Sequence, residues 1–331
     1  MSNQISFTRE NRIPFWDISK AFLIYLVILG HCVAAYRING GSDILYRIIY
    51  EFHMPCFMMV SGFFAAKSIK KQGALSLVKY ACRLLLPLVG FAVFQLIFVI
   101  EWATIRPIRI YGAFFDLWFL PVLFECVVAY YVVAICKSWL YRVFAFFFIW
   151  IASALAIDVP YLNLAWVYCS RFAFMWPFFI LGAFISAELI EKMKSYLWGG
   201  GSLALYISLL YIVHPSSFWW CGFCSTDTWL NFLMAISGCM AFFFSTALVT
   251  QYVQKCNLLK KIGQSTLGIY ILQFMYFAFP LPACLVLPFG NDYVSLIVLS
   301  LVITLLMYGI YFLTRRMMMF RLFLYGEARA K

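Results

Sequence analysis

The sequence predicts an all-α polytopic membrane protein, a helical bundle with about ten transmembrane helices. Three observations lead to this class. Hydrophobic residues make up 65% of the chain and charged residues only 11%, whereas soluble domains are nearer half apolar and a quarter charged. The apolar residues gather in runs of about 20, the length that crosses a bilayer. The lysines and arginines, finally, are concentrated in the connections that would lie on one side of the membrane.

Each apolar run is an expected helix. The runs lie at 15–37, 44–66, 77–100, 116–136, 139–157, 165–187, 196–214, 228–252, 265–287 and 293–314. Very little separates the fourth run from the fifth, so nine spans is the alternative. Because the chain shows no internal repeat and no long polar stretch, we expect one integral membrane domain over residues 1–331, without a soluble domain.

The distribution of lysine and arginine predicts that both ends of the chain are cytoplasmic. With the N-terminus inside, most of the 25 lysines and arginines fall in cytoplasmic segments. The outer side and the outer helix ends then hold Arg37, Arg47, Arg106, Arg109 and Arg171. Topology and contact with anionic lipid therefore explain the net charge of +12, and we expect no nucleic-acid partner.

Two histidines stand out, because ionisable groups inside hydrocarbon are expensive and are functional candidates by default. His31 lies in the first apolar run and His53 in the second. The midpoint of their numbers is Ser42, in the connecting turn, so an antiparallel hairpin puts both side chains at one depth. Neutral imidazole accepts a proton from a hydroxyl at physiological pH, which makes both residues catalytic candidates. The alternative is a histidine that is hydrogen-bonded to a backbone carbonyl.

A cluster of positive charge is expected at the cytoplasmic ends of the first three helices. Lys20 lies about three turns before the first histidine and shares its helix face. The same hairpin count puts Lys20 opposite Phe64, at a depth similar to that of Arg83. Nearby lie Lys67, Lys70, Lys71 and Lys79. Such a cluster suits a polyphosphate ligand. For Lys70 and Lys71 we favour the alternative, contact with lipid headgroups only.

Carboxylates and cysteines add fewer signals. Asp17, one turn before Lys20, is the expected anion for that lysine, and Asp17 and Glu51 are candidate substrate-binding residues. Zinc would need ligands at one level, but no HxxxH or HxxE spacing is present, so we expect no metal site. Cys221 and Cys224, in CGFC, would pair if their loop faces an oxidising compartment, and the sequence leaves this open.

Five stretches, spread in order over most of the chain, resemble the acyltransferase 3 family of integral membrane acyltransferases. The likeness is strongest to its branch of fucose 4-O-acetylase-like polysaccharide O-acetyltransferases. The stretches are DISKAFLIYLVILGH (Asp17 to His31), FHMPCFMMVSGFF (Phe52 to Phe64), KYACRLLLPL (Lys79 to Leu88), LWFLPVLF (Leu117 to Phe124) and GQSTLGIYILQ (Gly263 to Gln273).

This resemblance implies an enzyme of the bacterial inner membrane. Such enzymes move an acyl group, usually acetyl from acetyl-CoA, to a hydroxyl of a cell-surface glycan or a lipid-linked sugar. The family often has arginine, ten residues and histidine in its first helix, and Lys20 and His31 hold those positions here. Gln273 stands where the branch often has histidine, so a titrating role is not expected at that position.

The residues and the resemblance lead to one expected mechanism. The phosphates of acyl-CoA bind near Lys20, Arg83 and Lys79, and the thioester reaches toward His31. His31 deprotonates the sugar hydroxyl, which attacks the thioester carbonyl. His53 either donates a hydrogen bond to the oxyanion or orients the acceptor. A covalent acyl-histidine relay is the other route that the residues allow.

Two further residues are second-tier candidates for substrate binding. Trp118 lies in LWFLP, and Arg171 lies in an otherwise apolar helix, where it could bind an acidic sugar or pair with Asp158 or Glu101. The rival function is a transporter or flippase that exports a glycan or a small polar solute. A third is a non-catalytic subunit of a glycan-synthesis complex. Against the transporter, the chain has no repeated halves with paired broken helices.

Overall fold

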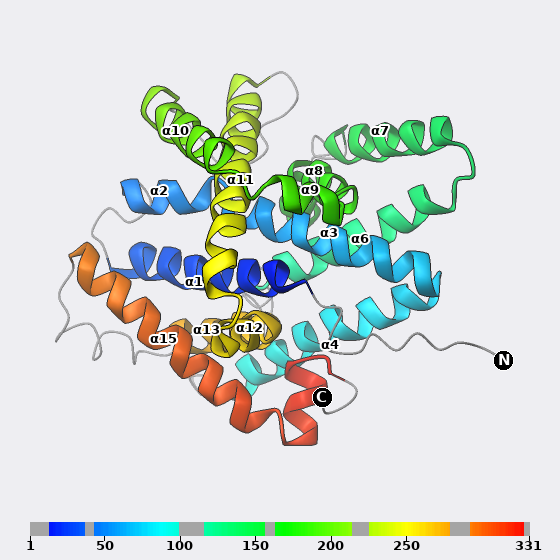
Figure 1. Ribbon diagram of the computed structural model, residues 1–331. Helices are drawn as coiled ribbons and strands as arrows, with labels where there is room; N and C mark the ends of the chain where they lie inside the picture. Colours follow the sequence, from blue (N-terminus) through cyan, green and yellow to red (C-terminus); the bar gives the residue numbers. More distant parts are fainter. Residues whose placement is uncertain are drawn as a thin grey trace.

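The computed structural model describes residues 13–36, 43–98, 116–155, 163–213, 225–278 and 292–327. Within these ranges every regular element is helical (Figure 1). The elements are α1 (Pro14–Tyr36), α2 (Ile44–Tyr50), α3 (His53–Gln72), α4 (Leu75–Phe98), α6 (Phe119–Ile135), α7 (Trp139–Leu155), α8 (Asn163–Ala183), α9 (Ala187–Lys192), α10 (Tyr196–Ile212), α11 (Thr226–Val253), α12 (Asn257–Gln264), α13 (Thr266–Ala278), α15 (Tyr293–Thr314) and the π-helical turn η4 (Phe320–Leu324).

The helices agree with the apolar runs of the sequence. In the described part of the chain, five helical stretches are long and apolar enough to cross a membrane: Pro14–Tyr36, Ile44–Gln72, Leu75–Val93, Thr226–Val253 and Tyr293–Thr314. Five shorter apolar helices accompany them: Phe119–Ile135, Trp139–Leu155, Cys169–Ala183, Tyr196–Ile212 and Thr266–Tyr276. Each of the ten expected runs overlaps one of these helices, although residues 279–287 of the ninth run lie outside the described ranges, and α6 and α7 are separate. The expected all-α polytopic membrane fold is confirmed.

The second expected span is not one straight helix. It breaks at Glu51 and Phe52, between α2 and α3, and α3 runs on to Gln72 rather than ending near residue 66. Pro55 accounts for the break, because its ring lacks an N–H and collides with the carbonyl four residues earlier. The extension of α3 carries its lysine-rich end to Gly73, whose positive φ of 55° ends the helix.

α1 lies in the middle of the bundle (Figure 1) and contacts α2, α3, α11, α12, α13 and α15. Most of its side chains are buried, because it is apolar all round. Gly263 brings α12 onto the backbone of α1 at Asp17, where any Cβ would collide with the Asp17 carbonyl. This close approach sets the next residue, Gln264, beside the Asp17 side chain.

α3 packs most extensively against α8. Gly62 of α3 faces the Phe179 carbonyl, and Gly182 of α8 faces the Met59 carbonyl, so a Cβ at either position would collide with backbone. Small residues at such crossings let membrane helices approach closely. The crossing fixes α3 as one wall of the site described next.

Candidate active site

A cavity of about 610 Å³ lies between α1, α3, α4, α6, α12 and α13, within the size range of small-ligand sites. Its lining on α1 runs from Ile13 to Val27, and on the antiparallel α3 from Gln72 to Met54. The charged residues occupy the start of α1 and the end of α3. Toward Val27 and Met54 the lining is apolar and aromatic. The cavity therefore has a charged end and an apolar end.

We call the charged end the cationic mouth and define it by Lys20, Lys67, Lys71, Lys79 and Arg83, all of which line the cavity. Asp17 is the single carboxylate among the described lining residues. Lys67 and Lys71 lie one turn apart on α3, as do Lys79 and Arg83 on α4. Two helices thus each contribute a pair of cations to the same space, an arrangement that favours a ligand with several negative charges.

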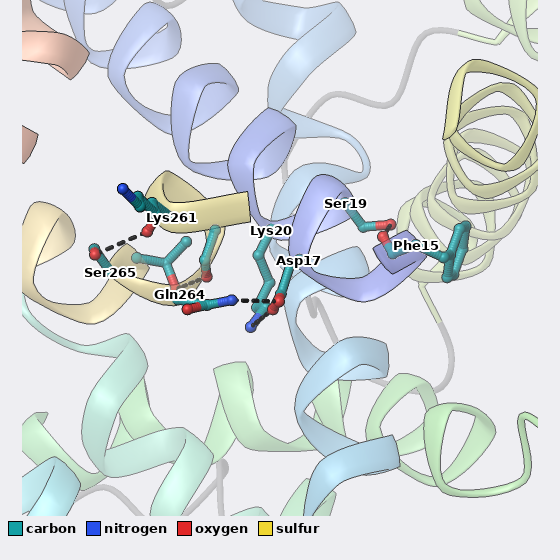
Figure 2. A network of polar contacts seen from close by, with 9 residues as sticks. Phe15, Asp17, Ser19, Lys20, Lys261, Gln264 and Ser265 are labelled. Atoms are coloured by element: carbon teal, nitrogen blue, oxygen red, sulfur yellow. Dashed lines mark hydrogen bonds and ion pairs between the residues drawn. The ribbon is translucent and has the colours of Figure 1, made fainter. Parts of the chain in front are cut away.

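Asp17 orients Lys20 at the inner edge of the mouth. Lys20 Nζ lies 2.9 Å from Asp17 Oδ1, and Gln264 Nε2 donates a hydrogen bond of 2.8 Å to Asp17 Oδ2 (Figure 2). Lys20 Nζ also lies 5.2 Å from the ring centroid of Phe64, the residue that the hairpin count puts opposite it. The ion pair that the spacing predicts is present, and Gln264 is a partner that sequence reasoning did not single out.

The neighbouring lysines divide. Lys67 Nζ lies 3.9 Å above the centroid of the Phe63 ring, a cation–π contact. Lys71 lines the cavity, whereas we favoured contact with headgroups only for Lys70 and Lys71. The reason is that α3 continues through both residues, and a helix turns consecutive side chains about 100° apart, which directs Lys71 inward and Lys70 elsewhere. Lys70 is exposed and is not part of the cavity lining.

Both candidate catalytic histidines lie around Tyr50, at the end of α2. The ring centroid of Tyr50 is 6.5 Å from that of His31 and 4.8 Å from that of His53. The His31 ring also packs edge-on against Phe274 of α13, at 5.0 Å. We call these four residues the histidine layer. They come from four helices, and Tyr50 lies beside both histidines.

His53 is held in one orientation by the break before α3. Its Nδ1 lies 2.8 Å from the carbonyl oxygen of Ile49, and because a carbonyl only accepts, Nδ1 carries the proton. In the neutral ring, Nε2 is then the acceptor. The neighbouring carbonyl, that of Ile48, accepts a hydrogen bond of 2.7 Å from the Tyr206 hydroxyl. The carbonyl partner that we raised as the alternative for a histidine is thus present at His53.

The histidine layer lies just past the apolar end of the cavity. His31 is one turn beyond Val27 on α1, Phe274 is one turn beyond Tyr270 on α13, and His53 directly precedes Met54. Val27, Tyr270 and Met54 all line the cavity, whereas the histidines do not. A ligand that fills the cavity from its mouth would thus end about one helical turn below His31.

The remaining candidates lie apart from the mouth. Glu51 is buried, pairs with Arg47 (Nε to Oε1, 3.4 Å) and does not line the cavity. Arg47 also donates to the Val213 carbonyl, so Glu51 belongs to a contact between α2 and the end of α10. Arg171 and Trp118, which the sequence singled out separately, are brought together, with the guanidinium 4.4 Å above the indole.

The structure leaves several predicted features without a place in the described lining of the cavity. Asp158, Glu101, Cys221 and Cys224 lie outside the described residues. In the described ranges no group of three histidine, cysteine, aspartate or glutamate side chains is placed to hold a metal ion. Gln273 is fully buried, and its amide atoms have no hydrogen-bond partner among the described residues. Nothing in the sequence singles out Tyr50, because an aromatic residue in an apolar run is ordinarily a packing residue.

The chain belongs to the acyltransferase 3 family, whose model, described as an acyltransferase domain, matches residues 13–316. It is similar to the nodulation protein NolL of Mesorhizobium japonicum, with 31% identity over 204 residues, 57% of this chain and 52% of that protein. It is also similar to NolL of Sinorhizobium fredii, with 29% identity over 212 residues, 60% of this chain and 55% of that protein. The chain thus matches about half the length of these relatives. No solved structure matches it.

Proposed function

We propose that this protein is an acyl-CoA-dependent membrane O-acyltransferase, which moves an acetyl or related acyl group to a hydroxyl of a cell-surface or lipid-linked glycan. The observation that carries the proposal is the cavity, which has five cations at one end and at the other end reaches Met54, next to His53, and Val27, one turn before His31. Membership of the acyltransferase 3 family supports the reaction class. The bacterial inner membrane is what the family resemblance implies, and the charge distribution of the sequence supports an orientation with the cationic mouth toward the cytoplasm.

The cavity supports acyl-CoA as the donor. Coenzyme A carries three phosphates at one end and a long, largely uncharged arm that ends in the thioester. The phosphates would bind Lys20, Lys79 and Arg83, with Lys67 and Lys71 adding charge. The arm would follow the apolar lining past Phe57 toward Val27, and so carry the acyl group up to the histidine layer. Acetyl is the default acyl group and succinyl is the alternative, since the sequence does not define an acyl pocket.

In the proposed reaction His31 is the general base. It takes the proton of the sugar hydroxyl as the hydroxyl oxygen attacks the thioester carbonyl, and the C–S bond breaks when the tetrahedral intermediate collapses. The imidazolium of His31 then returns the proton to the leaving thiolate, so coenzyme A departs as a thiol. For His53, the Nδ1–H contact with Ile49 supports the orienting role, because Nε2 can accept a hydrogen bond from a second hydroxyl of the sugar while His31 takes the proton of the attacking one.

The acceptor would approach from the opposite end of the bundle. The stacked pair of Arg171 and Trp118 supports a role in sugar binding, because an indole face stacks on sugar rings and a guanidinium binds an acidic group. Trp118 also contacts Phe119, which lines the cavity, at 6.1 Å between ring centroids. The sugar and the donor would then come together at α6, which lines the cavity.

The test is glycan O-acylation, measured by mass spectrometry of cell-surface and lipid-linked sugars in a deletion strain complemented with wild type or His31→Ala. We expect wild type to restore an ester mass and His31→Ala to fail at a normal protein level in the membrane. Full complementation by His31→Ala would rule out His31 as the base. If glycan export changes and no ester does, the transporter function replaces the enzyme.

A further inference from the structure

The chain continues past the region that the family model matches, which ends at residue 316. After α15 it turns back and forms η4 (Figure 1), which packs against α4, a helix that lines the cavity. We call residues Phe320–Glu327 the C-terminal strap. Although the strap is short, Leu324 and Tyr325 are buried, and Tyr325 is only 1% exposed. These two buried side chains make the strap part of the packed structure, although Phe323 is exposed.

The strap meets α4 at the backbone of Arg83, a residue of the cationic mouth. In α4 the carbonyl of Arg83 would accept from the N–H four residues later, but that residue is Pro87, which has none. Gly326 lies against this carbonyl. A Cβ on Gly326 would lie 2.5 Å from the Arg83 oxygen and 2.7 Å from its Cα. A glycine α-hydrogen therefore faces the oxygen that Pro87 leaves without a helical donor.

Gly326 fits this place for two independent reasons. Its φ is +59°, in the left-handed region that side chains with a Cβ adopt at a cost. Any Cβ would also collide with the Arg83 backbone, and backbone cannot rotate aside as a flexible side chain can. A second point of contact lies two turns further along α4, where the Phe323 carbonyl leaves no room for a Cβ on Gly90. The strap therefore packs against α4 at two points, Arg83 and Gly90, that lie two turns apart.

The other side of the strap is fastened to α15. The Tyr311 hydroxyl donates a hydrogen bond of 2.6 Å to Glu327 Oε1, and the hydroxyls of Thr314 and Tyr325 are 2.6 Å apart. The rings of Tyr311 and Tyr325 meet edge to face, with centroids 4.9 Å apart. Tyr311 packs in turn on Gly268 of α13. The strap thus connects α4 with α15 and α13, and α13 provides the opposite wall of the cavity.

We propose that the C-terminal strap is a positioning element, which holds the Arg83 turn of α4 so that its guanidinium stays at the cationic mouth. The proposal rests on the donor role given to Arg83 above. Without Gly326 at the open carbonyl, the turn before Pro87 loses the packing that fixes it, and Arg83 spends less time directed into the cavity. The strap itself touches no ligand and acts only through Arg83.

The experiment measures equilibrium binding of radiolabelled acetyl-CoA to the full-length protein in nanodiscs. Gly326→Ala is expected to weaken binding about tenfold, the scale of one lost charge-assisted contact. Gly309→Ala is the matched control, because a Cβ there, on α15, meets no atom within 4 Å. It should bind as wild type does. Tyr311→Phe, which removes the hydroxyl bound to Glu327 without a collision, should weaken binding about threefold.

A double-mutant cycle separates positioning from general destabilisation. In an Arg83→Gln background, Gly326→Ala should cause no further loss, because the strap then has no cation to position. An equal loss in both backgrounds would overturn the proposal, as would unchanged binding by Gly326→Ala. If Gly326→Ala does not fold, the same cycle with Tyr311→Phe decides. If the wild-type protein binds no acetyl-CoA, the proposed donor is refuted and the role of the strap with it. If wild type binds and the strap variants bind equally well, only the role of the strap is refuted.

Discussion

The cationic mouth and the histidine layer differ in the residues that form them and in the task proposed for each. The mouth consists of long, mostly exposed side chains on three helices, several of them one turn apart on the same helix. The histidine layer consists of rings from four helices packed against one another, with His53 held by a backbone carbonyl. A set of point charges can bind phosphates in many geometries, so single losses should be graded. Proton transfer needs one atom in one place, so its loss should be severe.

The largest effect should come from His31→Ala. General base catalysis contributes about 10²–10⁴-fold to a rate, so ester formation should fall by that order while acetyl-CoA binding is unchanged. Ester content of glycans from the complemented deletion strain measures the first quantity. Equilibrium binding to purified protein measures the second. A variant that loses binding as well would mean that the layer and the mouth are not separate in function.

His53→Ala should be the next most severe change, and it should also cost stability. The substitution removes the ring that orients the acceptor and leaves the Ile49 carbonyl without its side-chain donor. The carbonyl keeps a backbone donor, the Phe52 N–H at 3.4 Å, so the lost side-chain hydrogen bond costs about 1 kcal/mol. We expect a lower melting temperature together with a rate reduced about tenfold to hundredfold. A normal rate in a less stable protein would assign His53 to structure only.

Single charges at the mouth should have graded effects. Arg83→Ala and Lys71→Ala should each weaken acetyl-CoA binding, Arg83→Ala by about tenfold and Lys71→Ala by less, because a lysine ammonium lacks the two-pronged hydrogen bonding of a guanidinium. Lys70→Ala is the matched control, since Lys70 adjoins Lys71 but does not line the cavity. Binding by all cavity variants should converge with that of wild type at high salt, where exposed charges are screened. Equal losses for Lys70→Ala and Lys71→Ala would contradict this geometry.

The smallest functional effect should follow a change outside both regions. In α8, Pro177 leaves the Ala173 carbonyl without a helical donor, and the Trp150 indole fills that place at 2.8 Å. Trp150→Phe should cost about 1 kcal/mol of stability, with donor binding and transfer unchanged. Thermal unfolding monitors the first quantity. A loss of donor binding in Trp150→Phe would show that any destabilisation reaches the mouth, and would weaken the case for the C-terminal strap.

The helices and the two histidines could be predicted because both follow from regular features of the sequence. An apolar run of about 20 residues has one structural meaning in this composition, and a hairpin fixes which residues are level. The break at Glu51 was not predicted, although Pro55, four residues later, is the residue that causes it. Lys71 was also misjudged, because whether a lysine at a helix end turns inward depends on how far the helix continues.

Partners that are distant in sequence leave no such signal. Glu51 lies four residues after Arg47, a spacing that indicates their pairing, but the contact of Arg47 with Val213 depends on how α10 is packed. Gln264 reaches Asp17 only because Gly263 admits α12 to the backbone of α1. Likewise, Pro87 and Gly326 are each ordinary in the sequence. Only the fold brings the open carbonyl and the glycine together.

The central claim is that the cationic mouth binds the donor and the histidine layer transfers the acyl group. The most direct test measures acetyl-CoA binding to purified wild type, His31→Ala and Arg83→Ala, beside the glycan ester content that each restores in the deletion strain. We predict that His31→Ala binds the donor as wild type does and restores no ester. Arg83→Ala should bind about tenfold more weakly and still restore ester. If His31→Ala loses binding while Arg83→Ala retains it, the two regions do not have the roles assigned to them.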